Sequence, residues 1–259
     1  MNITGNTIFI PPGSTSGIGL ALALALHEKG NTVIVGGRRA DLLDGIADRH
    51  PGIDTVQIDT TDTASITRAA NQVLARHPPD LNAVIAMAGV MRVEDWHHPP
   101  ATFLDSAEAV ITTNLLGPIR LIAAFIEHLQ RQPAATIITV SSGLAFAPLK
   151  VTPSYNASKA AVHMLTETLR LQYADTSIQL IELEPPSVAT DLLPGQRDSS
   201  FAMPLDEFID EVMTILEADR DVKEIQVERV KFLRYAEARG DYDHVVATLN
   251  AADPHGNQT

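Results

Sequence analysis

The sequence predicts an α/β fold in which a doubly wound parallel sheet lies between two layers of helices. Short apolar segments with few charges alternate with longer, helix-like segments over most of the chain. Strands that are covered on both faces carry few charged residues, and the alternation of strand and helix is typical of βαβ units. Because βαβ crossovers are right-handed, their repetition produces a three-layer α/β/α architecture.

The expected elements follow one another in a regular order. Strand-like segments occupy residues 7–10, 32–36, 55–58, 83–87, 136–140 and 178–183, with a short last one at 225–227. Helix-like segments occupy residues 17–29, 40–49, 64–76, 103–131, 154–173, 203–218 and 230–249. The polar stretch at about 191–204 predicts either a loop that covers the site or an ordinary connection. Since the composition nowhere changes abruptly, residues 1–252 are expected to form one domain, followed by a flexible tail at 253–259.

Composition excludes several classes of function. The chain has 32 acidic and 19 basic residues and a net charge of −13, which argues against nucleic acid or an anionic membrane as the main partner. It has no cysteine, so disulfides, thiolate metal sites and a catalytic thiol are excluded. The apolar run at 20–26 is far shorter than the ~20 residues that span a bilayer. With no signal-peptide pattern at the first residues, a soluble, cytoplasmic protein is expected.

Histidine spacing gives no sign of a metal centre. The nine histidines are scattered along the chain. The pair His97–His98 lies in a loop rich in tryptophan and proline, without further ligands at suitable spacing. No metal is therefore expected.

A glycine-rich turn follows the first expected strand and opens the first expected helix. Its spacing is Gly-x-x-x-Gly-x-Gly, and its candidate phosphate-binding residues are Gly13, Ser14, Ser16, Gly17, Ile18 and Gly19. Glycines allow the tight turn and the close approach of backbone N–H groups to a pyrophosphate, next to the positive end of a helix dipole. Such a turn is sometimes plain loop chemistry, but its position in the first βα unit favours nucleotide binding.

The end of the second expected strand indicates which nicotinamide cofactor binds. No carboxylate stands there to accept from a ribose 2′-hydroxyl, and Arg38 and Arg39 follow instead. A guanidinium matches the geometry of a 2′-phosphate. The alternative is a solvated pair at a helix start. The sequence favours NADP (NADPH), with NAD possible.

Tyr155 and Lys159 lie four residues apart on an expected helix and therefore share one face. A cation next to a phenol favours the phenolate and lowers the phenol pKa. This predicts a proton donor and acceptor that works near neutral pH, as reduction of a carbonyl requires. Alone the pair is weak evidence, since the same spacing occurs by chance on solvated helices.

Taken in order, the motifs resemble the short-chain dehydrogenase/reductase family over roughly residues 5–193. The matching residues are Gly13-x-x-x-Gly17-x-Gly19, Asp59, Ala88-Gly89, Asn114, Ser142, Tyr155-x-x-x-Lys159 and Pro185-x-x-Val188-x-Thr190. The phrases at 140–146 and 182–190 are similar to the DltE-like subgroup. The resemblance implies a Rossmann fold and an enzyme that uses a dinucleotide cofactor.

The resemblance also implies roles for the catalytic residues. Tyr155 is the expected general acid/base, and Lys159 lowers its pKa and holds the nicotinamide ribose. Ser142 orients the carbonyl, with Ser141 as the competing choice, and Asn114 supports a proton relay through water to Lys159.

Further residues are implied to bind the cofactor. Asp59 would hold the adenine amino group, with Thr60 beside it, and Thr190 and the Val188 backbone would hold the nicotinamide carboxamide. The remaining implied contacts are Ala88, Gly89, Tyr155, Lys159 and Pro185. Three features depart from the family pattern: Pro12 replaces a frequent threonine, Ala86-Met87 replaces two asparagines, and the region from about Asp219 lacks the common glycine-rich ending.

The expected function is thus an NADP(H)-dependent oxidoreductase that interconverts a carbonyl (ketone or aldehyde) and an alcohol. The alternatives are a non-catalytic dinucleotide-binding sensor protein and a related epimerase or dehydratase. Apolar residues near the motifs, such as Leu144, Phe146 and Leu149, suggest a fairly hydrophobic small-molecule substrate. No nucleic acid or membrane partner is expected. The apolar helices at 103–131 and 154–173 resemble family helices that pair subunits, which implies a homodimer or homotetramer.

Overall fold

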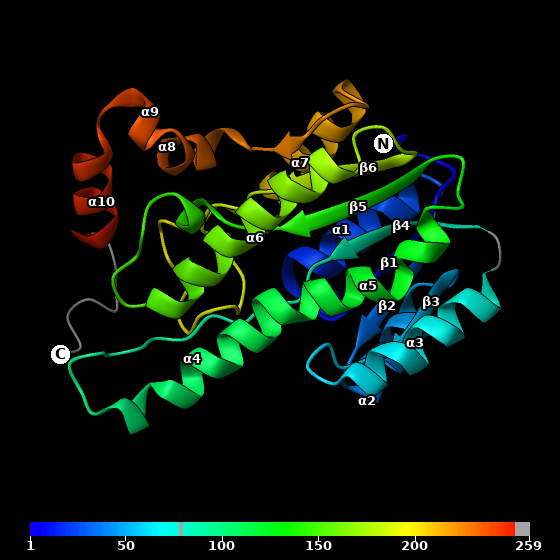
Figure 1. Cartoon of the computed structure of the whole chain (residues 1–259), viewed down its shortest axis with the longest axis horizontal. Helices are drawn as coiled ribbons and strands as arrows, with labels where there is room; N and C mark the ends of the chain where they lie inside the picture. Colours follow the sequence, from blue (N-terminus) through cyan, green and yellow to red (C-terminus); the bar gives the residue numbers. More distant parts are fainter. Residues whose placement is uncertain (78–79, 252–259) are drawn as a thin grey trace.

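The computed structural model describes residues 1–77 and 80–251 and confirms the predicted α/β fold (Figure 1). Seven strands form one sheet in the order β3-β2-β1-β4-β5-β6-β7, and each described pairing is parallel. The strands are β1 (Thr7–Ile10), β2 (Thr32–Gly37), β3 (Ile53–Gln57), β4 (Leu81–Ala86), β5 (Ala135–Val140), β6 (Ile178–Leu183) and β7 (Glu224–Ile225). The strand order changes direction between β1 and β4, and a ligand site is expected beyond the carboxyl ends of the strands at such a point.

Helices cover both faces of the sheet. One apolar core contains residues of α1 (Gly17–Glu28), α2 (Ala40–Arg49) and α7 (Leu205–Ala218). A second core, on the other face, contains residues of α3 (Thr63–Arg76) and α5 (Gly117–Leu129), with α6 (Pro153–Gln172) against it. Because the two cores cover both faces of the sheet, most side chains of the strands are buried, and this explains why the strand segments are apolar with few charges.

Strand β1 shows how one short segment serves both cores. Ile8 and Ile10 lie in the first core and Phe9 in the second, and all three side chains are fully buried. Successive side chains of a strand point to opposite faces, so four residues suffice to anchor both helix layers. The ring of Phe9 lies 5.4 Å from that of Phe125 on α5.

The expected helix at 103–131 is one long rod with a local distortion. It consists of α4 (Leu104–Ile111), a π-helical turn at Thr112–Leu116, and α5. Such π-helical turns are rare and occur often at functional sites. By length and composition alone, Leu104–Leu129 could cross a membrane. In the fold this stretch contacts α3, α6 and strands β4 and β5.

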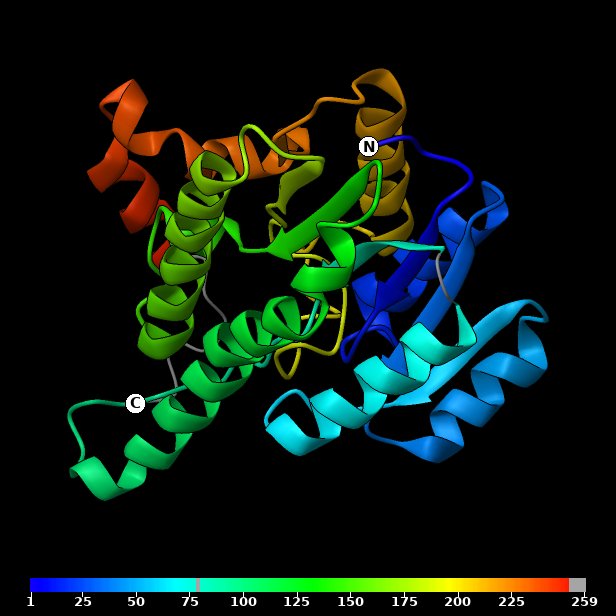
Figure 2. The same ribbon diagram turned by 45° about the vertical axis from the view of Figure 1, so that its right-hand side comes forward.

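The C-terminal part departs from its prediction. The single helix expected at 230–249 is divided into α8 (Lys231–Arg234), α9 (Ala236–Arg239) and α10 (Tyr242–Ala251). Gly240 causes one break, because its left-handed backbone (φ +78°) ends α9. These helices gather at one end of the molecule, beyond the carboxyl ends of β5 and β6 (Figures 1 and 2). The three helices are called the C-terminal cap below; the expected tail at 253–259 lies outside the described residues.

The loop before α7 is joined at its base. Val188 and Met203 form a parallel β-bridge. The N–H of Ala189 donates to the carbonyl of Met203 at 2.8 Å, and the N–H of Met203 donates to that of Ser187 at 2.8 Å. Residues 189–202 therefore form a loop whose two ends are fixed to each other. It is called the substrate loop below.

Candidate active site

The turn after β1 has a backbone that only glycine fits. Gly13 and Gly17 have positive φ angles of 109° and 55°. A Cβ on Gly19 would lie 2.1 Å from the carbonyl oxygen of Gly13, and a Cβ on Gly13 would lie 2.9 Å from that of Met87. The turn is thus packed backbone against backbone, and its outer side is open to a ligand.

Two adjoining cavities run along this turn and have Gly13, Ser16, Gly89 and Val90 in common. The smaller one, of about 190 Å³, is lined by Arg38, Arg39, Asp59, Thr60 and Ala88, among others. The larger one, of about 400 Å³, is lined by Gly17, Ile18, Gly19, Ser142, Tyr155, Lys159, Pro185, Val188 and Thr190, among others. The structure therefore brings together nearly all of the residues that the sequence predicts for the cofactor.

Ser14 is the exception. Its side chain is fully buried, and the single proton of its hydroxyl has the carbonyl oxygens of Ile10 (2.6 Å), Pro11 (3.0 Å) and Gly36 (3.1 Å) as acceptors within reach. It joins the end of β1 to β2 and lines neither cavity. Its hydroxyl therefore holds the turn together, because three carbonyls surround it, and a contact of Ser14 with the cofactor stays a prediction.

The adenosine end of the groove is polar. The carboxylate of Asp59 accepts from the N–H (2.9 Å) and the hydroxyl (2.8 Å) of Thr61, which fixes its orientation. Arg38 and Arg39 are exposed and line the same cavity. Neither guanidinium is in an ion pair with any described residue, so both are available to an anion.

The residues present fit an elongated dinucleotide. The glycine turn offers N–H groups for two phosphates, and Gly17 lies against Thr190, since a Cβ there would be 3.3 Å from its methyl group. Asp59 and the two arginines line one end of the groove, and Thr190 and Lys159 line the other. A nicotinamide dinucleotide bound in this order would supply or accept a hydride next to Tyr155.

Ser142 and Tyr155 lie where the cofactor groove meets a third cavity. Ser142 ends the loop after β5 and caps a short 3₁₀ helix, accepting from the N–H of Leu144 at 3.1 Å. Tyr155 is in the first turn of α6 and is almost entirely buried. Both line the groove and the third cavity, whereas Ser141 lines the groove only. This supports Ser142 over Ser141 as the residue that orients a substrate.

Lys159 and Asn114 flank Gly89 in the floor of the groove. The ammonium of Lys159 donates to the carbonyl of Val140 at 2.8 Å and lies 5.5 Å from the centre of the Tyr155 ring. A Cβ on Gly89 would be 3.6 Å from the Lys159 Nζ and 3.8 Å from the Asn114 Oδ1. Asn114 lies in the π-helical turn. Its side-chain oxygen accepts from the N–H of Val90 at 2.8 Å, and its side-chain nitrogen donates to the carbonyl of Val90 at 2.9 Å.

Burial governs the ionisation of the catalytic pair. It raises the pKa of Tyr155 to about 12, although the Ser142 hydroxyl beside it acts in the opposite direction. It lowers the pKa of Lys159 to about 8, against the attraction of the Glu182 carboxylate. Loss of solvent around the phenol favours its neutral form, and the lowering of the Tyr155 pKa by Lys159 stays a prediction. Tyr155 is a neutral phenol at neutral pH and carries the proton that a reduction needs.

The third cavity, called the substrate cavity below, has a volume of about 270 Å³ and walls that are mostly apolar. The substrate loop supplies Leu192, Leu193, Gln196, Ser199 and Phe201. The C-terminal segment supplies Arg229, Phe232, Leu233, Thr248 and Leu249. Of the apolar residues expected near the substrate, Leu144 and Leu149 line this cavity, whereas the ring of Phe146 lies 4.2 Å from the Arg234 guanidinium and does not line it. The C-terminal residues could not be expected, since nothing in the linear pattern places them near Tyr155.

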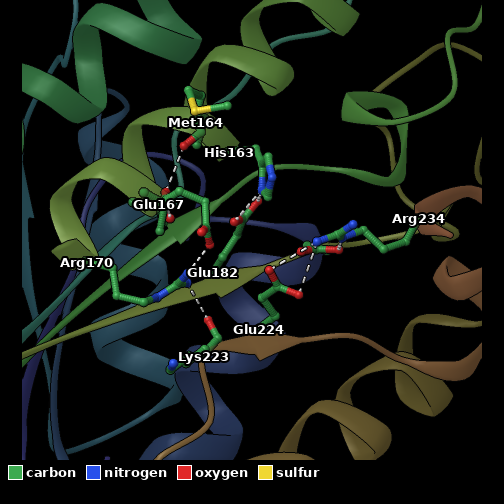
Figure 3. A network of polar contacts seen from close by, with 12 residues as sticks. His163, Met164, Glu167, Arg170, Glu182, Lys223, Glu224 and Arg234 are labelled. Carbon is green, nitrogen blue, oxygen red and sulfur yellow. Dashed lines mark hydrogen bonds and ion pairs between the residues drawn. The ribbon is translucent and has the colours of Figure 1, made fainter. Parts of the chain in front are cut away.

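A buried ion-pair network lies behind the catalytic helix (Figure 3). His163, one turn after Lys159 on α6, lies 2.9 Å from the carboxylate of Glu182 on β6. Arg234 of the cap lies 3.3 Å from Glu184 and 3.3 Å from Glu224. One imidazole and three carboxylates of this network have possible metal-ligand atoms within 4.8 Å of one another; they belong to His163, Glu182, Glu184 and Glu224. The sequence alone does not predict this grouping. Because the guanidinium of Arg234 lies among the carboxylates, the network is explained without a metal.

Glu94 is a further residue that the sequence analysis misses. It is buried, and its carboxylate accepts from the N–H (3.3 Å) and the hydroxyl (2.8 Å) of Ser154 at the start of α6. It also accepts from the indole N–H of Trp96 at 3.1 Å. A carboxylate stabilises a helix N-terminus, so Glu94 fixes the turn that carries Tyr155.

Comparisons with known proteins identify the family of this chain. Residues 7–200 match the family described as short chain dehydrogenase. An uncharacterized oxidoreductase, DltE, of Bacillus subtilis is 38% identical over 258 residues, which are 98% of this chain and 100% of that protein.

Two solved structures are also similar. A short chain dehydrogenase from Burkholderia cenocepacia in complex with NADP has a TM-score of 0.77 and 26% identity, covering 96% of this chain and 99% of that one. An alcohol dehydrogenase from Thermococcus sibiricus complexed with 5-hydroxy-NADP has a TM-score of 0.74 and 25% identity, covering 85% and 95%. The chain therefore belongs to the short chain dehydrogenase family and is an oxidoreductase that acts on CH–OH or C=O groups with NAD(P).

Proposed function

We propose that the protein uses NADP(H) to interconvert a ketone or aldehyde and the corresponding alcohol, with Tyr155 as general acid/base. The observation that carries this proposal is the position of Ser142 and Tyr155, which line both the cofactor groove and the substrate cavity. A carbonyl oxygen bound by these two hydroxyls would lie where the two cavities meet, within reach of a dinucleotide that would supply the hydride from the groove.

In the direction of reduction, negative charge develops on the substrate oxygen. Ser142 and Tyr155, whose side chains are almost entirely buried, stabilise it by donating hydrogen bonds. Tyr155 then gives its proton to the oxygen, and the buried ammonium of Lys159 stabilises the phenolate that remains. Asn114 fixes the backbone of Val90 by two hydrogen bonds. This keeps the wall of the groove next to Lys159 in place while the phenolate of Tyr155 takes up a new proton.

The preference for NADP(H) is part of the proposal. Arg38 and Arg39 line the adenosine end, are exposed, and have no carboxylate within ion-pair distance among the described residues. A ribose 2′-phosphate is the group that two free guanidiniums at this place would bind.

A small, fairly hydrophobic substrate, a cytoplasmic location and a homodimer or homotetramer complete the proposal. The walls of the substrate cavity are mostly apolar. Helices α5 and α6 expose large apolar side chains, and these are Ile119, Met164 and Leu171. Association of two copies through these helices would cover them.

The experiment that tests the proposal is the Tyr155→Phe substitution, which removes one hydroxyl. NADPH oxidation would be followed with a carbonyl substrate that the unmodified protein accepts. We expect kcat to fall by about 10²- to 10⁴-fold, while NADPH still binds in a fluorescence titration. Unchanged turnover would contradict the mechanism. Binding of NADPH without turnover of any carbonyl by the unmodified protein would favour the sensor, and product formation without net NADPH oxidation would favour an epimerase or dehydratase.

A further inference from the structure

The substrate cavity has one charged residue in its wall, Arg229. The other lining residues are apolar or neutral, and Arg229 is exposed to solvent, as are Phe201, Phe232 and Thr248 of the same cavity. Arg229 belongs to the short 3₁₀ helix Glu228–Val230, which leads into the C-terminal cap. It lies opposite the substrate loop, since its Nη1 donates to the carbonyl of Phe201 at 3.4 Å. Arg229 is thus at a solvent-exposed edge of the cavity, between loop and cap, and this edge is called the mouth of the cavity below.

Several basic side chains of the substrate loop and the C-terminal segment are paired with a carboxylate. Lys231 lies 2.7 Å from Glu228, and Arg197 lies 2.5 Å from Asp191. Arg234 and Arg239 of the cap are paired as well, with Glu184 (3.3 Å) and Asp241 (3.2 Å). Arg229, by contrast, has no carboxylate within ion-pair distance in the described part of the chain.

The carboxylate of Glu228, the residue next to Arg229 in sequence, does not pair with the Arg229 guanidinium. Glu228 turns to Lys231, away from the residue next to it in sequence. A guanidinium has five N–H donors, and the one long bond to Phe201 leaves most of them without a protein partner. In a chain with a net charge of −13, an unpaired cation at the edge of an apolar cavity is a site for an anion.

We propose that the substrate is an amphiphile with an oxyanion head, a carboxylate or a phosphate, which Arg229 binds at the mouth of the cavity. The apolar part of the substrate extends along the cavity wall towards Ser142 and Tyr155, where its carbonyl is reduced. This inference rests on the proposed function and names its substrate class. In the reaction the carbonyl carbon gains a hydride and its oxygen gains the Tyr155 proton, and the head group is unchanged.

The size of the cavity limits the apolar part. Its volume of about 270 Å³ is near the lower end of the ~300–1,000 Å³ typical of ligand pockets. One short or medium chain fits such a space, whereas a lipid with two long chains does not. Oxo acids and oxoalkyl phosphates of moderate length are therefore the compounds to test.

The test compares acids with neutral compounds of the same shape. Straight-chain oxo-octanoates with the carbonyl at different positions, the matching oxo-octanamides and the matching oxo-octyl phosphates would be assayed with NADPH. Binding of octanoate, octanamide and octyl phosphate to the protein would be measured by calorimetry, which needs no turnover. The variants are Arg229→Gln and Arg229→Lys. The matched control is Arg131→Gln, which removes one positive charge at the other end of the sheet.

We expect the unmodified protein to prefer an anion over its amide by about tenfold or more in kcat/KM and in affinity. Arg229→Gln should remove this preference by weakening the anion alone, Arg229→Lys should keep part of it, and Arg131→Gln should keep all of it. Whether the carboxylates or the phosphates have the higher kcat/KM and affinity shows which of the two head groups the natural substrate carries.

Two outcomes would overturn the inference. One is equal affinity of the unmodified protein for anions and amides. The other is an equal loss for both in Arg229→Gln, which would mean that Arg229 only holds the loop through Phe201. If the anion preference in calorimetry were present but no carbonyl were turned over, the anion site would stand and the proposed function would fail.

Discussion

The Nδ1 of His163 lies 2.9 Å from a carboxylate oxygen of Glu182, and this contact joins the catalytic helix to the sheet. His163 follows Lys159 by one helical turn on α6, and Glu182 is fully buried on β6. The bond to Glu182 raises the pKa of His163, and the same carboxylate acts against the burial that lowers the pKa of Lys159. One buried carboxylate thus serves both a structural pair and the electrostatics of the active site.

Replacing His163 should destabilise the protein in a pH-dependent way. His163→Leu leaves the Glu182 carboxylate buried without this partner, and we expect a loss of about 2–3 kcal/mol in the free energy of unfolding at pH 6. Because the folded pKa of His163 is raised, the stability from the pair is present below the ordinary histidine pKa and is lost as pH rises through the raised value. Urea unfolding of His163→Leu and His163→Gln at pH 6 and pH 9 measures this. Equal losses at both pH values would contradict the prediction.

Replacing Glu184 should change stability in the opposite direction. Burial raises the pKa of the Glu184 carboxyl to about 7. The folded protein holds this proton at pH values where the unfolded chain has lost it, so stability declines as pH rises from about 4.5 to about 7. A glutamine at this position cannot lose a proton. The free energy of unfolding of Glu184→Gln, measured relative to that of the unmodified protein, should therefore increase by roughly 2 kcal/mol when the pH is raised from 5 to 8. Thermal or urea unfolding at the two pH values checks this, with the exposed Glu207→Gln as a control that should show no such gain.

Adding one methyl group to the phosphate turn should abolish cofactor binding. In Gly19→Ala the new Cβ would lie 2.1 Å from the carbonyl oxygen of Gly13, so the turn must change shape. We expect NADPH affinity to fall by more than tenfold in a fluorescence titration. The control is Gly45→Ala within α2, where the nearest atom to the new Cβ is 3.9 Å away at the end of the Arg49 side chain. That variant should be stabilised by up to about 1 kcal/mol and should bind NADPH normally; a Gly19→Ala protein that did the same would refute the packing argument.

The choice between NADPH and NADH should depend on two guanidiniums. Arg38→Gln and Arg39→Gln each remove a cation from the adenosine end of the groove. We expect each to weaken NADPH binding by about tenfold and to change NADH binding by less than twofold, because only NADPH carries the 2′-phosphate. Arg49→Gln at the other end of α2 is the charge-matched control. Tighter binding of NADH than NADPH by the unmodified protein would refute the assignment.

Much of the fold could be predicted because both faces of the sheet are covered. Strands buried on two sides must be apolar and uncharged, so the bounds of β1 and β6 agree with the prediction residue for residue. The glycine turn was predictable for a similar reason, since its backbone allows no side chain at Gly13 and Gly19.

The remainder depends on contacts between residues that are distant in sequence. The hydroxyl of Ser14 turns inward because the carbonyl of Gly36, on a neighbouring strand, is among its partners. The raised pKa of Tyr155 follows from burial, which no local pattern reveals. Arg229 lies at the substrate cavity only because the C-terminal segment folds back over the active site, and the division of the expected helix at 230–249 is part of that path.

The bridge between Val188 and Met203 has a practical consequence for protein engineering. Because this bridge already closes the chain, exchanging or lengthening the segment between the two residues adds little entropic cost and leaves β6 and α7 undisturbed. Segments grafted from related enzymes between Thr190 and Met203 would bring new walls to an unchanged catalytic pair and would leave Thr190 in the cofactor groove. The molecule is therefore a suitable scaffold on which specificity can be redesigned by replacing one short piece of chain.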